Sequence, residues 1–503
     1  MNIKRAKEEI KNTIEAYLLK DRYGAYEIPA IRQRPVLLIG PPGIGKTQIM
    51  EQISRECQIG LVAYTITHHT RQSAVGLPFI EKKNYAGREY AVTEYTMSEI
   101  VASIYDKIED SGLKEGILFI DEINCVSETL APTMLQFLQC KTFGNHKIPE
   151  GWIIVAAGNP PEFNKSVREF DIVTLDRIKM IHVEADLTVW KEYAEQVNIH
   201  PAIRSYLEVK PQNFCQIETT VDGKQFATPR GWEDLSRLIE VYERLGKTAD
   251  REVIGQYLQH PRIAKDFANY LELYDKYQKD YRVEEILEGR VRPGVYEKLD
   301  RAPFDERLSV ISLLLAALNN AFRELAEEEA RMQRLQSCLK KLNPQSGTQT
   351  DGRTLPERLQ ALIRQTEEER ERREEAGLLS RGEDHLYRDT LQELKRFAGL
   401  LTGEMPEPQA WETITEAFGL RSDAYEALSE RCGEKLEHAF DFVEAAFETG
   451  QETVVFVNGL NSGFYSISFL QDYECERYYR YNKQFLFEDQ EQDILDAIRK
   501  KEK

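Results

Sequence analysis

The sequence predicts an α/β fold: a mostly parallel β-sheet flanked by helices, followed by a small all-α domain and a mainly helical C-terminal region. Short apolar runs alternate with helical patterns between Arg34 and about Glu184, which is typical of a sheet wrapped by helices. From Asp186 the apolar residues follow helical spacing, and from about Glu284 long charged helices dominate. Because 503 residues exceed the size of a single hydrophobic core, we expect two or three domains.

Five apolar runs define the predicted strands: PVLLIG at 35–40, LVAYTI at 61–66, GILFID at 116–121, GWIIVAAGN at 151–159 and IKMIHVE at 178–184. Helical spacing of apolar residues lies between them, as at Ile49, Met50 and Ile53. Segments 79–92 and 140–152 carry Gly or Asn between β-prone flanks, and we interpret both as hairpins inserted on the core.

The predicted domains are an α/β domain with an N-terminal helix at 1–185, a helical lid domain at 186–282 and a charged, mainly helical region at 283–503. Asp186 is the expected N-cap of the first lid helix. A polar Gly/Pro/Ser/Thr stretch predicts a flexible linker near 343–354. Near the end, ETVVFVNGL at 452–460 predicts a late strand, against which we expect the tyrosines of 473–481 to pack rather than to stack on bases.

Charge and composition narrow the class of protein. With 66 Lys and Arg against 85 Asp and Glu, the formal net charge is −19, so nucleic acid is not the expected partner. The seven cysteines form no CxxC or Cys/His cluster, which indicates reduced thiols rather than zinc or disulfides. The first residues lack the apolar core of a signal peptide, and no window of about 18 apolar residues predicts a membrane span. We therefore expect a cytoplasmic protein.

The segment GPPGIGKT satisfies the phosphate-loop pattern GxxxxGK[ST] between a predicted strand and a predicted helix. Its glycines let backbone N–H groups surround a phosphate, and the following helix adds its positive N-terminal end. Lys46 is expected to bridge the β- and γ-phosphates and Thr47 to ligate Mg²⁺. The predicted nucleotide-binding residues of this loop are Gly40, Pro41, Pro42, Gly43, Ile44, Gly45, Lys46 and Thr47.

Polar residues also follow two further predicted strands. ILFIDEIN ends in adjacent carboxylates, which point in different directions at the end of a strand. Asp121 is therefore expected to face Mg²⁺ through water, and Glu122 to polarise a water aligned with the γ-phosphate. Asn159 ends the run GWIIVAAGN, and its amide can hold that water or a phosphate oxygen. A turn residue before Pro160 is the alternative interpretation of Asn159.

The motifs GPPGIGKT, ILFIDEIN, WIIVAAGNPP, TLDRI and ATPRGWEDLS, in that order, resemble an AAA+ ATPase of the MoxR-like group, within the dynein-related ATPases. The resemblance covers roughly residues 1–280 and implies Asn159 as sensor 1, Arg177 as the arginine finger and Arg230 as the sensor-2 arginine. Arg168 is the alternative finger, and an ion pair with Asp176 is the alternative role of Arg177.

Many relatives place a polar residue after the second strand that restrains the catalytic glutamate; here Thr67 or His68 fits that position. The stretch RQSAVGLPF at 71–79 is either a loop facing the pore or a partner, or a simple surface insertion.

The resemblance implies a hexameric ring with ATP and Mg²⁺ between subunits, which hydrolyses ATP to remodel a protein partner bearing a von Willebrand factor A domain. The alternative is a nucleotide-dependent nucleic-acid motor or nuclease-associated subunit that acts in defence against foreign DNA. The segment EKKNYAGR at 81–88 is the candidate basic segment for that alternative. A regulatory module that binds ATP without hydrolysis is a third hypothesis. The residues alone leave ATP and GTP undistinguished.

Overall fold

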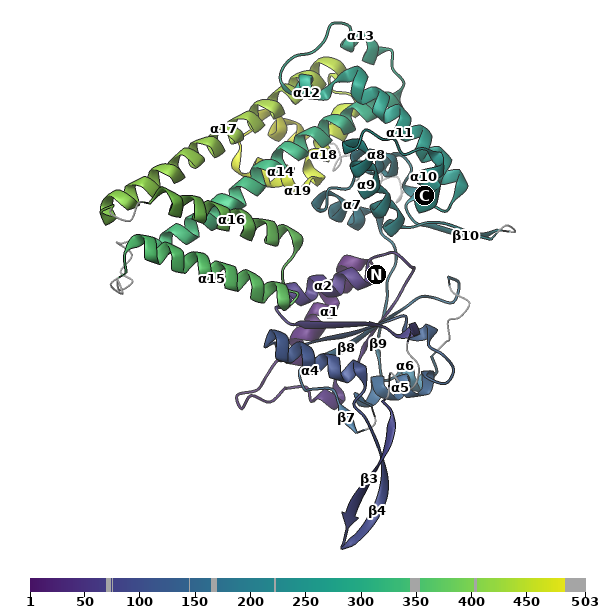
Figure 1. The fold of residues 1–503 in the computed structure, drawn as a ribbon. Helices are drawn as coiled ribbons and strands as arrows, with labels where there is room; N and C mark the ends of the chain where they lie inside the picture. The colour runs from purple at the N-terminus through teal and green to yellow at the C-terminus, as the bar shows by residue number, and fades with distance from the viewer. Residues whose placement is uncertain are drawn as a thin grey trace. The chain divides into compact units, whose positions relative to one another are not determined.

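A computed structural model of the chain describes residues 1–68, 74, 76–143, 145–163, 170–220, 223–343, 353–401 and 405–484. Contacts divide the chain into two compact units (Figure 1). Unit 1 comprises Met1–Val189, Cys215–Gly231 and Thr366–His385, and unit 2 comprises Trp190–Phe214, Trp232–Gln365 and Leu386–Lys503. Most of the predicted linker, and residues 71–73 and 75 of the 71–79 stretch, lie outside the described residues.

Unit 1 is built on a five-stranded parallel sheet with the strand order β2-β5-β8-β1-β9. The strands are β1 (Val36–Ile39), β2 (Gly60–Thr65), β5 (Gly116–Asp121), β8 (Trp152–Gly158) and β9 (Lys179–His182). All five predicted strands are confirmed, and so is the α/β class with a mainly helical C-terminal part. Strand β1 lies inside the sheet, between β8 and β9, so that the loop after β1 opens beside the ends of these two strands.

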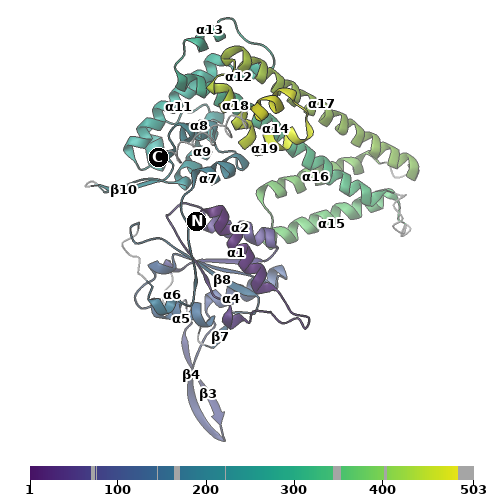
Figure 2. The same cartoon turned by 180° about the vertical axis from the view of Figure 1, so that it is seen from behind.

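Both faces of this sheet are covered by helices, as the continuous burial of its central strands β5, β8 and β1 requires. One face carries Val36 and Leu38 and packs against α1 (Ile3–Leu18) and α2 (Lys46–Cys57). The other carries Leu37 and packs against α4 (Glu99–Ser111) and α5 (Ala131–Cys140). Figure 2 shows the same layers from behind. The sheet is therefore the middle layer of a three-layer unit.

Three hairpins project from the core of unit 1. The two predicted ones are confirmed as β3 (Pro78–Tyr85) with β4 (Arg88–Tyr95), and β6 (Thr142–Phe143) with β7 (His146–Lys147). The tip of the first has positive φ at Ala86 and Gly87, as a two-residue hairpin turn requires. The third, β10 (Gln216–Thr220) with β11 (Gly223–Ala227), interrupts the helical segment that follows residue 186 and was not anticipated from the sequence. The short elements are η1 (Ala30–Arg32), η2 (Ile66–His68), η3 (Ile123–Cys125), α6 (Ile172–Leu175) and η4 (Pro211–Asn213).

Unit 2 is helical, and some of its helices extend into segments of unit 1. The carboxylate of Asp186 accepts a hydrogen bond from the Thr188 amide at 2.9 Å, which confirms the predicted cap. The helices are α7 (Leu187–Gln196), α8 (Pro201–Val209), α9 (Pro229–Arg244), α10 (Arg251–Tyr257), α11 (Pro261–Tyr281), α12 (Val283–Leu287), α13 (Val295–Asp300), α14 (Phe304–Leu342), α15 (Leu355–Glu375), α16 (Arg381–Leu400), α17 (Glu407–Phe447), α18 (Gln451–Ser462) and α19 (Phe464–Asp472).

The predicted late strand at 452–460 is wrong, because these residues form helix α18. Its β-branched residues favour a strand locally. However, Thr453, Phe456, Val457 and Leu460 are buried, and their spacing matches one face of a helix. A Cβ added at Gly459 would lie 2.3 Å from Leu315 Cδ1, so this glycine lets α18 approach α14 closely.

The terminal tyrosines consequently pack on helices rather than on a strand. The Tyr481 hydroxyl donates to Glu444 on α17 at 2.9 Å, and its ring lies parallel to that of Phe440. The Tyr478 hydroxyl donates to Asn461 on α18 at 2.6 Å. These contacts favour the packing role over stacking on bases.

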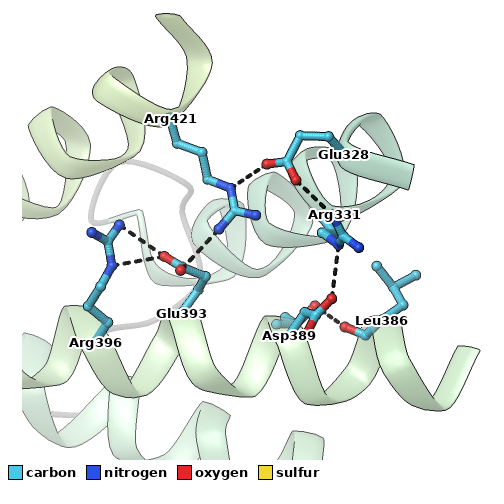
Figure 3. Close-up of polar contacts among 8 residues, drawn as sticks. Glu328, Arg331, Leu386, Asp389, Glu393, Arg396 and Arg421 are labelled. Atoms are coloured by element: carbon cyan, nitrogen blue, oxygen red, sulfur yellow. Dashed lines mark hydrogen bonds and ion pairs between the residues drawn. The ribbon is translucent and has the colours of Figure 1, made fainter. Parts of the chain in front are cut away.

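Ion pairs join three long helices of unit 2 (Figure 3). Arg331 on α14 contacts Asp389 on α16 at 2.9 Å, and Arg421 on α17 contacts Glu328 on α14 at 2.8 Å and Glu393 on α16 at 3.1 Å. Charged residues thus cross-link these helices, although isolated exposed pairs contribute little individually.

One described helix, α14, is long and apolar enough to cross a membrane by length and composition. Its most apolar window has a mean hydropathy of 1.3, and 61% of that window is buried by the rest of the protein. Burial of most of this window is typical of a helix in the core of a folded unit.

Candidate functional site

The phosphate loop connects the end of β1 to α2. Gly43 and Gly45 have φ values of 77° and 91°, the left-handed region that glycine adopts without strain. A Cβ added at Gly40 would lie 2.4 Å from the carbonyl oxygen of Val183, so only glycine fits where the loop begins. The loop therefore has the backbone conformation and close approach that a phosphate cradle needs.

Lys46 is buried at the start of α2 and its ammonium has three neutral acceptors. Nζ donates to the carbonyl oxygens of Gly40 and Pro41, both at 2.8 Å, and to Asn159 Oδ1 at 3.0 Å. Burial lowers the pKa of Lys46 to about 8; Asp121 and Glu122 oppose this shift and Arg230 adds to it. A buried cation among neutral acceptors fits a phosphate group, which would supply the missing negative charge.

Thr47 and Asp121 form the candidate metal site. Thr47 Oγ1 donates to Asp121 Oδ2 at 3.0 Å, and the other oxygen of Asp121 accepts from the Glu122 amide at 2.9 Å. A hydroxyl and a carboxylate are hard oxygen donors of the kind that Mg²⁺ prefers. The donor set therefore fits the Mg²⁺ of a nucleotide complex.

Glu122 follows β5 in a left-handed backbone conformation, with φ 57° and ψ 33°. Such a conformation is uncommon for residues other than glycine and often occurs at functional sites. Thr67 Oγ1, in η2 after β2, donates to Glu122 Oε2 at 3.1 Å. Of the two candidates left open by the sequence, Thr67 thus contacts the glutamate, while the side chain of His68 lies outside the described residues.

Asn159 lies directly beyond β8, where its side chain meets Lys46. Its backbone oxygen accepts a hydrogen bond from Asn124 Nδ2 at 2.8 Å. Sequence reasoning assigned no role to Asn124, although its position two residues after the carboxylate pair was a usable signal. The structure therefore joins the ends of β5 and β8 through two asparagines.

Arg230 and Arg177 are both exposed. The amide of Arg230 donates to the Gly43 carbonyl at 3.2 Å, which places the start of α9 against the phosphate loop. Arg177, after α6, donates to the side-chain oxygen of Gln139 on α5 and makes none of the hydrogen bonds described for the Lys46 cluster. No ion pair joins Arg177 to Asp176 among the described residues, and Arg168 lies outside them.

Residues 35–178 match the family model described as the AAA domain of the dynein-related subfamily. No curated protein matches the chain. The matched segment holds the phosphate loop, both carboxylates, Asn159 and Arg177. The dynein-related part of the predicted resemblance is thus confirmed, and the narrower MoxR-like assignment stays a prediction.

Proposed function

We propose that this protein hydrolyses ATP to change the conformation of a protein partner, as a ring ATPase of the MoxR-like group. The observation that carries the proposal is the buried ammonium of Lys46, whose hydrogen-bond acceptors are all neutral. Lys46 follows a loop in which Gly43 and Gly45 have the left-handed backbone conformation. The Thr47–Asp121 pair and Glu122 complete the set that phosphoryl transfer requires.

Each residue has a distinct proposed role. Lys46, with the phosphate-loop amides, binds and orients the phosphates, while Thr47 and Asp121 hold Mg²⁺. Mg²⁺ neutralises charge on the phosphate oxygens when it is bound. Glu122 accepts the proton of the attacking water, and Asn159 orients that water. Arg230 responds to the phosphates from the start of the lid helix α9, since its backbone already contacts Gly43.

The proposed hexamer rests on the resemblance, and the surface around Arg177 supports an interface between copies. Ile172 and Val173 of α6 are 84% and 60% exposed, and Arg177 follows them with only a neutral hydrogen-bond partner described. Exposed apolar residues beside an arginine are typical of an interface. We propose that this face meets a second copy, so that Arg177 completes the neighbouring nucleotide site.

The proposed client is a protein with a von Willebrand factor A domain, encountered in the cytoplasm. A net charge of −19 disfavours the nucleic-acid motor. Its candidate basic segment is also largely neutralised, because Lys82 pairs with Glu89 and Lys83 pairs with Glu81 and Glu94. ATP is preferred over GTP on the resemblance alone.

The test is ATP turnover against protein concentration for wild type, Glu122→Gln and Arg177→Ala, with mass photometry of the same samples in ATP. Turnover should rise with a ring-sized species, and Arg177→Ala should abolish turnover while it still binds ATP. A wild type that binds ATP as a monomer without turnover at any concentration would instead support the regulatory module. DNA-stimulated turnover would support the nucleic-acid motor.

A further inference from the structure

We infer that Asn124 is a positioning residue for Asn159, and that Gly158 is glycine in order to leave room for the Asn124 side chain. The inference rests on the proposed function, because it concerns the asparagine assigned to orient the attacking water. It adds a residue that neither the sequence motifs nor the family match assigns.

The contact itself is a partly buried hydrogen bond of ordinary length. Asn124 is 4% exposed and lies in η3, directly after the carboxylates of β5. Its Nδ2 donates to the backbone oxygen of Asn159 at 2.8 Å. The side chain of Asn159 in turn accepts from Lys46 Nζ at 3.0 Å. One chain of hydrogen bonds therefore connects the carboxylate loop, Asn159 and the phosphate-binding lysine.

Gly158 provides the second, independent observation. A Cβ at this last residue of β8 would lie 2.5 Å from Asn124 Oδ1, 2.7 Å from Cγ and 2.9 Å from Nδ2. These three side-chain atoms are the nearest to that Cβ, and all belong to one residue. Since Cβ atoms essentially never approach this closely, any larger residue at 158 must displace Asn124.

This arrangement explains why the two asparagines act as a unit. A backbone anchor on Asn159 limits the movement of its side chain relative to Lys46 and Glu122. Small displacements of positioning groups lower reaction rates strongly, whereas ground-state binding by the phosphate loop does not depend on the anchor. The expected signature is a loss of kcat without a loss of nucleotide affinity.

The first experiment uses the full-length protein without nucleotide and measures thermal unfolding. Gly158→Ala should lower Tm by roughly 3–8 °C in the wild-type background, because the added methyl group meets Asn124. In an Asn124→Ala background, the same change should lower Tm by no more than about 1 °C. In the isosteric Asn124→Asp background, which keeps the volume, the large effect should return. Equal effects in all three backgrounds would overturn the steric part.

The second experiment measures steady-state ATP turnover and the affinity for a fluorescent ATP analogue. Asn124→Ala and Asn124→Asp should each lower kcat roughly 10- to 100-fold, while KM and analogue affinity change less than about twofold. Asn124→Asp separates hydrogen bonding from shape, because it keeps the volume and loses the N–H donor. Unchanged kcat in both variants would overturn the positioning role.

Ser54→Ala is the matched control. Ser54 is 3% exposed, and its hydroxyl donates to the backbone oxygen of Ile59 at 2.7 Å. Ser54→Ala therefore removes a comparable buried hydrogen bond from a side chain to the backbone, outside the site. This variant should lower Tm without lowering kcat. If it lowered kcat as much as Asn124→Ala does, the effect of Asn124 would be purely structural and the inference would be refuted.

Failure of the proposed function remains distinguishable from failure of this inference. A wild type that hydrolyses no ATP would refute the proposed function. The nucleotide-free unfolding cycle would still test the Asn124–Gly158 contact. Gly158→Ala should then still show coupling to Asn124→Ala in the same unfolding assay, and additive effects of these two variants would refute the inference.

Discussion

Replacing Thr67 by valine removes the hydroxyl that contacts Glu122 while keeping the size and branching of the side chain. In the structure, Thr67 Oγ1 donates to Glu122 Oε2 at 3.1 Å. We propose that this hydrogen bond restrains the glutamate when no client is engaged. Thr67→Val should therefore release Glu122 and raise the basal rate of ATP hydrolysis.

The size of the effect follows from the nature of the hydrogen bond. A hydrogen bond to a charged group contributes roughly 1.5–3 kcal/mol. Because the hydrogen bond between Thr67 and Glu122 is exposed to solvent, the lower end of this range, about 1.5 kcal/mol, applies. Its loss corresponds to about a tenfold change in the ratio of released to restrained Glu122. Basal turnover should thus rise by up to about tenfold, and nucleotide affinity should not change.

The assay is steady-state ATP turnover at saturating ATP, with Thr67→Ser as the control that retains the hydroxyl and should behave like the wild type. Glu122→Gln defines the background without the catalytic base. If Thr67→Val instead fell toward the rate of Glu122→Gln, Thr67 would orient the glutamate for catalysis, and the restraint would be refuted.

Three further predictions concern stability and assembly. Burial lowers the pKa of Lys141 from 10.5 to about 8, so between these pH values the folded state binds fewer protons than the unfolded state. The free energy of unfolding of the wild type should therefore rise by up to about 3 kcal/mol from pH 7 to 10.5, relative to that of Lys141→Met. Denaturant unfolding that shows no such difference between the two proteins would contradict this prediction. Gly459→Ala should destabilise the protein by about 1–3 kcal/mol through its clash with Leu315, whereas Gly419→Ala, with open space around it, should not. Ile172→Asp should weaken ring assembly at least about tenfold by mass photometry in ATP without changing the Tm of the monomer, and unimpaired assembly would exclude this face from the interface.

The sheet and most of the site were predictable because their signals are local. The central strands β5, β8 and β1 are continuous apolar runs, as strands buried on both faces must be. Asp121 and Asn159 lie at or just after the ends of β5 and β8, and Lys46 begins α2 after the loop that follows β1. Parallel strands bring those ends to one edge of the sheet. Their convergence therefore followed from the order of the motifs.

The missed features depend on contacts between distant segments. Residues 452–460 are rich in β-branched side chains, and their packing against α14, α17 and α19 favours a helix. The contact of Thr67 with Glu122 likewise required the fold of η2. For Asn124, the residue type and position were visible, but the contact with Asn159 was not.

The central claim, a nucleotide site completed by Arg177 of a neighbouring copy, is tested most directly by mixing two inactive variants. Arg177→Ala retains Glu122, and Glu122→Gln retains Arg177. A random 1:1 mixture should recover roughly a quarter of wild-type turnover, the share of interfaces that combine both intact residues. Mixed assemblies that form, as seen by mass photometry, but recover no turnover would contradict the claim.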